Sequence, residues 1–194
     1  MKRIIILVLA VILVLSVSCS YSGSGNVVET KLDISGFDKI EAFDGFSVNI
    51  TKGDTFSVVI SIDDNLVEHL SVVKKGDTLK LDMASTKSFR NVTTLKAEVT
   101  MPELTSVILN DGARATASGT GEEIYIEAND GCNADLSAFE VKKATAKADD
   151  GSEITVNASD SLIAEATDGS KVYYLGDPTD LTTDASDGGD VIQR

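Results

Sequence analysis

Five aspartates, each followed by glycine, recur in the second half of the chain at spacings of 19, 20, 18 and 19 residues. They are Asp111, Asp130, Asp150, Asp168 and Asp187. If equivalent segments stack as strands, these carboxylates come within about 5 Å of one another, where like charges repel and raise one another's pKa. Calcium prefers several carboxylate and carbonyl oxygens, so one interpretation of the column is a weak calcium site.

The same pairs have a simpler interpretation as turns. Aspartate caps a turn by accepting a hydrogen bond from a nearby backbone N–H, and glycine supplies a positive φ. The glycine- and aspartate-rich nonapeptide of calcium-binding β-rolls is absent, because the period here is twice as long. We therefore favour turns over cation binding, and cation binding over catalysis, and we expect no resident cofactor.

Evidence for catalysis is sparse. The chain has no visible nucleophile motif, metal-ligand cluster or phosphate loop, and its one histidine, His69, is expected to be solvated. Some parallel β-helix proteins are polysaccharide lyases or glycosidases, so a carbohydrate-active enzyme is an alternative by fold analogy alone. Aromatic residues that could stack on sugars are few, with six Phe, four Tyr and no Trp. Of these, only Tyr173 is expected to be exposed on a repeat surface, so the prediction is a protein without enzyme activity.

The residues around each Asp-Gly pair alternate in polarity, which predicts the elements that position the column. Around Asp130, for example, Ile126 and Ala134 are apolar, whereas Glu127 and Asn133 are polar. Such alternation indicates strands with one buried face. Two strands per copy, joined at Asp-Gly and stacked in parallel, predict an all-β fold: a single-stranded parallel β-helix, or β-solenoid, with repeats of about 19 residues.

The position of the aspartates in this alternation sets a condition on the fold. Each lies an even number of residues from the inward-facing apolar residues, so a straight strand would point its carboxylate into the core. Burying a column of unpaired carboxylates would cost too much free energy. The chain must therefore turn at Asp-Gly and place each carboxylate at a corner.

The first half of the chain is less regular. Asp44-Gly45 resembles a sixth copy of the repeat. Residues 70–73 and 78–83 flank Lys-Gly-Asp and predict an antiparallel hairpin inserted near the N-terminal half. Pro102 marks a strand end, and the repeats become regular from residue 104. Residues 37–194 are accordingly predicted to form one domain.

Residues 1–18 have the features of a signal peptide, in which Lys2 and Arg3 precede an unbroken apolar run over residues 4–15. The small residues before Cys19 resemble a bacterial lipobox, although Leu15 stands four positions before the cysteine rather than three. Cys19 is therefore predicted to carry lipid, palmitate included, and to anchor the protein to a membrane. The alternative is an ordinary signal peptide cut near Ser18. Residues 19–36, rich in Gly and Ser, are predicted to be a flexible tether.

The chain carries a net charge of −14, which favours some partners and excludes others. Nucleic acid and anionic headgroups are repelled by such a surface, so no nucleic-acid partner is expected. Cations, glycans and envelope proteins remain candidate partners. With Cys19 lipidated, Cys132 has no disulfide partner and is predicted to be a small buried residue.

Two stretches carry a resemblance to a known family. They are DNLVEHLSVVKKGDTLKLDM and KAEVTMPELTSVILNDGARATASG. In their order they resemble the bacterial family called "putative autotransporter adhesin, head GIN domain", over roughly residues 37–194. The chain differs in having Asp before most repeat glycines, where the family often has Ser. The resemblance implies an exported or lipid-anchored envelope protein with a β-helical fold, and it transfers no catalytic residues.

Together these features predict a bacterial cell-envelope lipoprotein that displays an acidic β-solenoid for binding, adhesion or a structural role. In a Gram-negative host, its place would be the outer membrane or cell surface. Besides the enzyme alternative, the chain could be a subunit of an envelope assembly. The last strand, near residues 191–194, would leave an open edge that favours oligomers.

Overall fold

The computed structural model describes residues 20–84 and 88–194, which form strands and one 3₁₀ helix, η1 (Asp64–His69). The strands are β1 (Ser20–Ser22), β2 (Val27–Leu32), β3 (Lys39–Ala42), β4 (Ser47–Lys52), β5 (Ser57–Asp63), β6 (Leu70–Lys75), β7 (Thr78–Met83), β8 (Ser88–Arg90), β9 (Leu95–Met101), β10 (Ser106–Leu109), β11 (Arg114–Ala128), β12 (Asn133–Ala148), β13 (Glu153–Ala166), β14 (Lys171–Leu175), β15 (Asp180–Ala185) and β16 (Asp190–Gln193).

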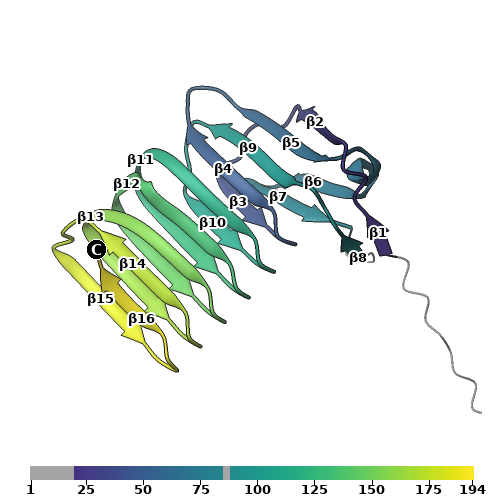
Figure 1. Cartoon of the computed structure of the whole chain (residues 1–194). Helices are drawn as coiled ribbons and strands as arrows, with labels where there is room; N and C mark the ends of the chain where they lie inside the picture. Colours follow the sequence, from purple (N-terminus) through teal and green to yellow (C-terminus); the bar gives the residue numbers. More distant parts are fainter. Residues whose placement is uncertain (1–19, 85–87) are drawn as a thin grey trace, which may run out of the picture.

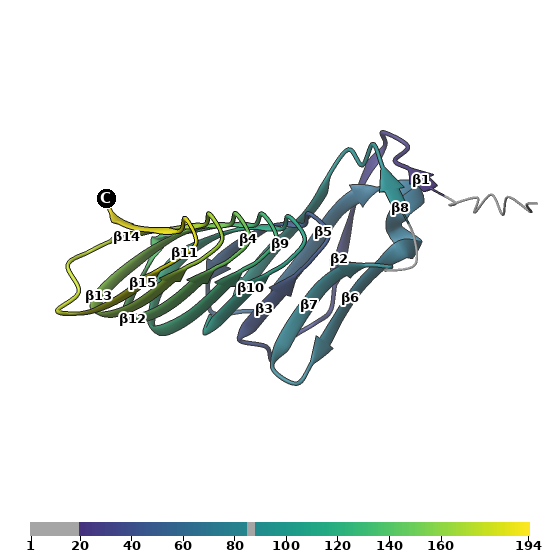
Figure 2. The same ribbon diagram turned by 90° about the horizontal axis from the view of Figure 1, so that it is seen from below.

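Within the described residues, fourteen strands form one sheet, and β1 and β8 form a separate parallel pair. The long strands β11, β12 and β13 bend midway, so their first halves lie in one wall and their second halves in another. Wall A continues from these strands through β4, β9, β5 and β2 on one side and through β14 and β16 on the other. Wall B continues through β10, β3, β7 and β6, with β15 beyond β13. The sheet thus curls over its own core (Figures 1 and 2).

The predicted single-stranded parallel β-helix is wrong. The fold is all-β, but it is a mixed, curled half-barrel sheet in which β2–β5, β5–β9 and β6–β7 pair antiparallel. Alternation with a period of two identifies a strand and its buried face, but it does not specify the direction of the neighbouring strand. The prediction extended the parallel stacking of the second half to the whole chain. One part of the fold prediction is confirmed: the inserted antiparallel hairpin is β6–β7, with its turn at Gly76-Asp77.

The predicted two strands per repeat are also corrected. Between one Asp-Gly pair and the next, β11 and β12 run as continuous strands of 15 and 16 residues. β11 bends near Gly119, whose φ of 131° favours glycine, and a Cβ atom there would lie 2.6 Å from the Cβ of Lys52. A register shift between Thr116 and Ser118 accompanies the bend. In the repeats of β11, β12 and β13 the corner opposite the Asp-Gly turns is therefore a bend within a strand, whereas residues 176–179 separate β14 from β15 as predicted.

The N-terminal segment departs from the predicted flexible tether of residues 19–36. Ser20–Ser22 pair with Ser88–Arg90, and Val27–Leu32 pair antiparallel with β5. The segment after residue 19 is therefore part of the folded domain. Cys19 and the predicted signal peptide, residues 1–18, lie outside the described residues. No helix in the described part of the chain is long and apolar enough to cross a membrane.

The core lies between the walls and changes in character along the molecule. Towards β2–β9 it contains large side chains such as Phe46 and Leu79, both fully buried. Along the later repeats it narrows to stacked alanines, among them Ala128, Ala148 and Ala166. Small side chains bury little apolar area, so the hydrogen-bond ladder between neighbouring strands carries more of the stability there.

Two adjacent residues of β13 test which face is buried. Leu162 is fully buried, whereas Ile163 is 42 % exposed on the outer face. Leu162→Ala should lower the free energy of unfolding by about 2–5 kcal/mol, because it leaves a cavity. Ile163→Ala, the matched control, should cost less than about 1 kcal/mol. Urea unfolding measures both, and equal losses would contradict the observed facing of β13.

Candidate functional site

The five predicted Asp-Gly pairs are turns, and so is Asp44-Gly45. Both residues of each pair have positive φ, for example 56° at Asp111 and 73° at Gly112. Two consecutive left-handed residues define a type I′ turn. The Ala113 amide closes this turn by donating to the Asn110 carbonyl at 3.3 Å. The turns and the positive φ of their glycines are therefore confirmed, and so is the inference that the chain turns at Asp-Gly.

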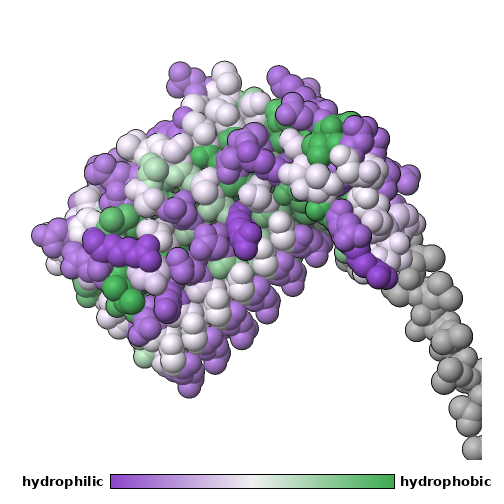
Figure 3. All heavy atoms as spheres, viewed as in Figure 1, coloured by the Kyte–Doolittle hydropathy of each residue, from purple (hydrophilic) through white to green (hydrophobic). Residues whose placement is uncertain are grey.

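The turns are joined by a backbone hydrogen-bond ladder. The Gly112 amide donates to the Asp130 carbonyl at 3.1 Å, and the Gly131 amide donates to the Asp150 carbonyl at 3.0 Å. The pattern repeats at every Asp-Gly pair as far as Asp187. Strand register is thus carried through each turn, and the turns form a stepped, hydrophilic edge (Figure 3).

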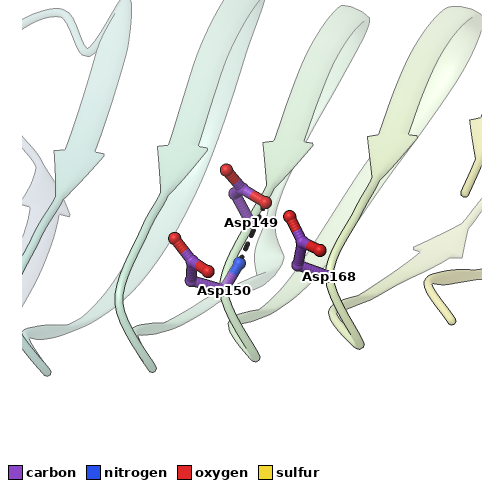
Figure 4. Close-up of side chains that lie close together, drawn as sticks. All are labelled: Asp149, Asp150 and Asp168. Atoms are coloured by element: carbon purple, nitrogen blue, oxygen red, sulfur yellow. Dashed lines mark hydrogen bonds between the residues drawn. The ribbon is translucent and has the colours of Figure 1, made fainter. Parts of the chain in front are cut away.

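The side chains of the aspartates form a smaller cluster than the sequence predicts. Among the described residues, the group whose oxygens could surround one cation is Asp149, Asp150 and Asp168, with candidate ligand atoms within 4.8 Å of one another (Figure 4). The structure therefore brings together two of the predicted aspartates, Asp150 and Asp168, and adds Asp149, which directly precedes Asp150 in the sequence. Asp111, Asp130 and Asp187 join no such group. Cation binding stays a prediction, restricted to this cluster.

The three carboxylates of the cluster are not equivalent. The Asp149 carboxylate accepts a short hydrogen bond from the Thr167 hydroxyl and another from the Asp150 amide at 3.0 Å. The Thr167 hydroxyl in particular lowers the pKa of Asp149. Burial, followed by the charges of Asp149, Asp187 and Asp150, raises the pKa of Asp168. Asp149 is thus favoured as the anion, whereas the raised pKa of Asp168 favours its protonated form.

Neither Cys132 nor Tyr173, both singled out in the sequence, presents an open surface to a ligand. Cys132 is a buried free thiol in the described part of the chain, and burial raises its pKa. Tyr173 is half-buried, with the Arg194 guanidinium 3.3 Å from its ring centroid. The aromatic surface predicted at Tyr173 is therefore covered.

His69 is not the solvated residue that the sequence suggests. Its ring packs edge-on against Tyr21, with centroids 4.3 Å apart, and lies 5.6 Å from the Phe89 ring. Its Nε2 atom is buried without a hydrogen-bond partner in the described residues and lies 3.9 Å from the Glu68 carboxylate. His69 thus packs the contact between η1 and the β1–β8 pair.

A polar network that sequence reasoning missed holds the segment after residue 19. We call it the N-terminal clamp and define it as Asp63, Asp64 and Asn65 together with residues 22–26. The Asp63 side chain is fully buried and accepts hydrogen bonds from the Gly25 amide, the Thr93 amide and the Thr93 hydroxyl at 2.7, 2.7 and 2.8 Å. Burial alone would raise the pKa of Asp63, but these donors hold it below its ordinary value.

The other two side chains of the clamp hold the same segment. Asp64 accepts hydrogen bonds from the Ser24 hydroxyl at 2.6 Å and from the Asn26 amide group at 2.8 Å. Asn65 accepts from the Ser24 backbone amide at 3.0 Å and donates to the Ser22 carbonyl at 2.9 Å. In the sequence, Asp-Asp-Asn indicates only the end of a strand, because the partners lie about 40 residues away in the chain.

Comparisons with known proteins give a family and a fold. The sequence matches the model of "Putative auto-transporter adhesin, head GIN domain" over residues 36–119 and 107–178. A crystal structure of a "putative adhesin" from Bacteroides fragilis is 18% identical with a TM-score of 0.60, covering 89% of this chain and 99% of that one. A "putative adhesin" from Parabacteroides distasonis is 15% identical with a TM-score of 0.58, covering 91% of this chain and 100% of that one.

A third solved structure carries a different name. A "putative lipid binding protein" from Parabacteroides distasonis is 15% identical with a TM-score of 0.52, covering 91% of this chain and 100% of that one. At these identities the three likenesses establish a shared fold. No curated protein is significantly similar to this chain.

Two substitutions in the cluster should have opposite effects. The raised pKa of Asp168 means that its charge destabilises the fold above the ordinary value of 3.8. Asp168→Asn should therefore raise the melting temperature at pH 7, and this gain should disappear as the pH falls below about 4. Asparagine is chosen because it tolerates the left-handed φ of this position. Asp149, with its lowered pKa, stabilises the fold at pH 7, so Asp149→Asn should lower the melting temperature there.

The same melts, repeated in calcium and in chelator, test the cation prediction. A calcium-dependent rise for the wild type that Asp168→Asn abolishes would establish a cation site. Identical wild-type melts in calcium and chelator would remove that prediction and leave the turn role alone.

The clamp is tested with Asp63→Asn. An asparagine amide places an N–H group where one of the three donors now points, so the segment at residues 23–26 should loosen. Amide hydrogen exchange over residues 24–32 should speed up by about tenfold or more, while the later repeats stay protected. Asp54→Asn, at an exposed turn, is the matched control. Unchanged exchange in Asp63→Asn would show that the clamp does not hold this segment.

Proposed function

Because this chain belongs to the "Putative auto-transporter adhesin, head GIN domain" family, we propose that it is an exported, lipid-anchored envelope protein that displays its curled sheet for binding. Membership of this family points to an adhesion or binding role and to a place at the cell surface. The finer features, which are the anchor at Cys19 and the way the domain is held, are proposals from the residues themselves.

The N-terminal clamp is the observation that carries this proposal. It fixes residues 22–26 to η1 and to the loop before β9, only a few positions after Cys19. A lipid on Cys19 would then be joined to the ordered strand β1, without a long flexible linker. The end that carries β1 and β8 would lie near the membrane, and the repeats would extend away from it, since β16 lies at the other end of the molecule (Figure 1).

The charge of the chain favours a covalent anchor over simple adsorption. At −14, the protein would be repelled by the anionic headgroups to which basic proteins bind. Acyl chains supply attachment through burial of methylene groups, which does not depend on surface charge. The same acidic surface would keep neighbouring displayed copies apart.

A binding role is also a better match to the site than catalysis. The Asp-Gly turns, which are the most regular feature of the sequence, hold the backbone in register through hydrogen bonds between neighbouring turns. Structural neighbours are likewise named for adhesion or lipid binding. We therefore propose that the domain acts as a displayed binding surface.

The anchor is tested by comparing the two cysteines. Growth of expressing cells with labelled palmitate should label the wild-type protein, and the label and the membrane association should both be lost in Cys19→Ala. Cys132→Ala is the matched control and should keep both, because Cys132 is buried in the core. A Cys19→Ala protein that stays labelled and membrane-bound would contradict the lipoprotein proposal, as would an unlabelled wild type.

A further inference from the structure

A hollow on the outer face of wall B is formed around Tyr125. On β11, Ile124 and Ile126 point into the core and are almost fully buried, so Tyr125 between them faces outward. The hollow has a volume of about 630 Å³ and is lined by strands β3, β10 and β11 and by the segment before β10. We call it the Tyr125 hollow. Its volume lies within the range of small-molecule sites, about 300–1,000 Å³.

A second hollow of about 620 Å³ adjoins it. The two share Glu103, Glu122 and Glu123 among their lining residues, so together they form one extended concave surface. An extended surface of this kind is suited to a chain of linked units rather than to a single small molecule.

The Tyr125 ring is held in a fixed position. Its hydroxyl donates to the Glu127 carboxylate at 2.5 Å, and Glu127 in turn accepts a hydrogen bond from the Asn129 side chain at 3.1 Å. Burial, followed by the hydrogen bond and charge of Glu127, raises the pKa of Tyr125 to about 12, so the hydroxyl stays protonated. A ring fixed before binding loses little conformational entropy when a ligand packs on it.

The lining combines an apolar floor with groups that hydrogen-bond. Tyr125 and Ile108 supply apolar surface, and the polar residues Glu103, Glu122 and Glu123 belong to the same lining. Tyrosine is well suited to a ligand that is apolar on one face and polar at its edge. A pyranose ring has this character, since its C–H face is apolar and its hydroxyl groups project around the rim.

The extended surface carries both signs of charge, with an excess of carboxylates. Its described lining residues hold four carboxylates and the ammonium groups of Lys52, Lys142 and Lys39, of which Lys39 pairs with Asp77 at 2.7 Å. Lys142 pairs with Glu122 at 2.8 Å, whereas Glu103 and Glu123 form no ion pair within the described residues. The unpaired carboxylates disfavour an anionic ligand, and they can accept hydrogen bonds from the hydroxyl groups of a neutral one.

The position of the hollow within the sheet disfavours an extended peptide. β10 pairs with β3 on one side and with β11 on the other, so its backbone groups are already hydrogen-bonded. A peptide that adds to a sheet needs a free strand edge. A ligand at this face must therefore be recognised by side chains, as sugars are.

We propose that the Tyr125 hollow and the surface adjoining it bind a neutral oligosaccharide. This inference rests on the proposed binding function and names its ligand class. A sugar ring packs its C–H face on Tyr125 and Ile108. Its hydroxyl groups donate to the free carboxylates of Glu103 and Glu123, and further sugar units occupy the adjoining hollow.

The test uses the mature protein purified from membranes in detergent. The probes are fluorescent hexasaccharides of β-1,4-glucose, β-1,4-mannose and β-1,4-N-acetylglucosamine, with octalysine as a basic peptide probe. Fluorescence polarisation should show binding of at least one hexasaccharide. Tyr125→Ala should weaken that binding by about tenfold or more, the usual effect of removing a central aromatic contact.

Two variants separate stacking from a structural role. Tyr125→Phe keeps the ring and loses the hydrogen bond to Glu127, so it should bind within about threefold of the wild type. Tyr173→Ala removes the other outward tyrosine, which Arg194 covers, and should leave binding unchanged. Thermal melting of each variant confirms that the fold is retained.

The proposal is overturned if no hexasaccharide binds, or if a folded Tyr125→Ala protein binds as tightly as the wild type. Octalysine binding that depends on Glu103 and Glu123, without saccharide binding, would assign the surface to basic partners instead. The saccharide-binding assay tests only the ligand class. The proposed function is tested independently by the Cys19 labelling experiment and by adhesion of whole cells. Cells that adhere through this protein without binding any of the three saccharides would retain the function and lose this ligand.

Discussion

The backbone hydrogen-bond ladder between neighbouring repeats is the constraint on which the rest of the structure depends. It runs along the walls and continues through each turn, where a glycine amide donates to the aspartate carbonyl of the next repeat. A turn of type I′ requires two left-handed residues, which few residues other than Gly, Asn and Asp adopt without strain. Because every repeat turns at the same corner, the same residue pair recurs there, and the ladder places its carboxylates one above another.

This constraint has different consequences inside and outside the sheet. Inside, stacked positions must have compatible sizes, and the later repeats meet this with alanine and with the buried Ser152 and Ser170. The hydroxyls of these serines accept hydrogen bonds from the amides of Cys132 and Ser152, so these two donors are paired inside the narrow core. Outside, the same stacking brings like charges together, and burial together with these neighbouring charges raises the pKa of Asp168. The turn chemistry that holds the fold thus opposes stability at neutral pH.

Much of the local structure could be predicted from the sequence, but its assembly could not. Alternation around Asp130 identified the strands and their buried faces, and Asp-Gly identified the turns, because both signals are local. The antiparallel partners of β5 and the clamp around Asp63 depend on residues about 30 to 40 positions away, so no local pattern reports them. Tyr173 and Tyr125 show the same limit, since the sequence indicated Tyr173 as the exposed ring, whereas Arg194 covers Tyr173 and Tyr125 faces outward. Only the folded chain distinguishes Tyr173 from Tyr125.

The distribution of charge connects the anchor with the proposed ligand surface. A chain of charge −14 is repelled by an anionic membrane. Attachment by lipid is therefore favourable only if most of the acidic surface is held away from the headgroups. The clamp meets this need if it fixes one end of the molecule towards the membrane, because the stepped acidic edge and the repeats then extend away from it. The concave surface around Tyr125 carries both signs of charge and lies over β10, which is paired on both sides by β3 and β11. Acidic repulsion elsewhere on the domain would then limit nonspecific contacts without weakening recognition of an uncharged ligand at this surface.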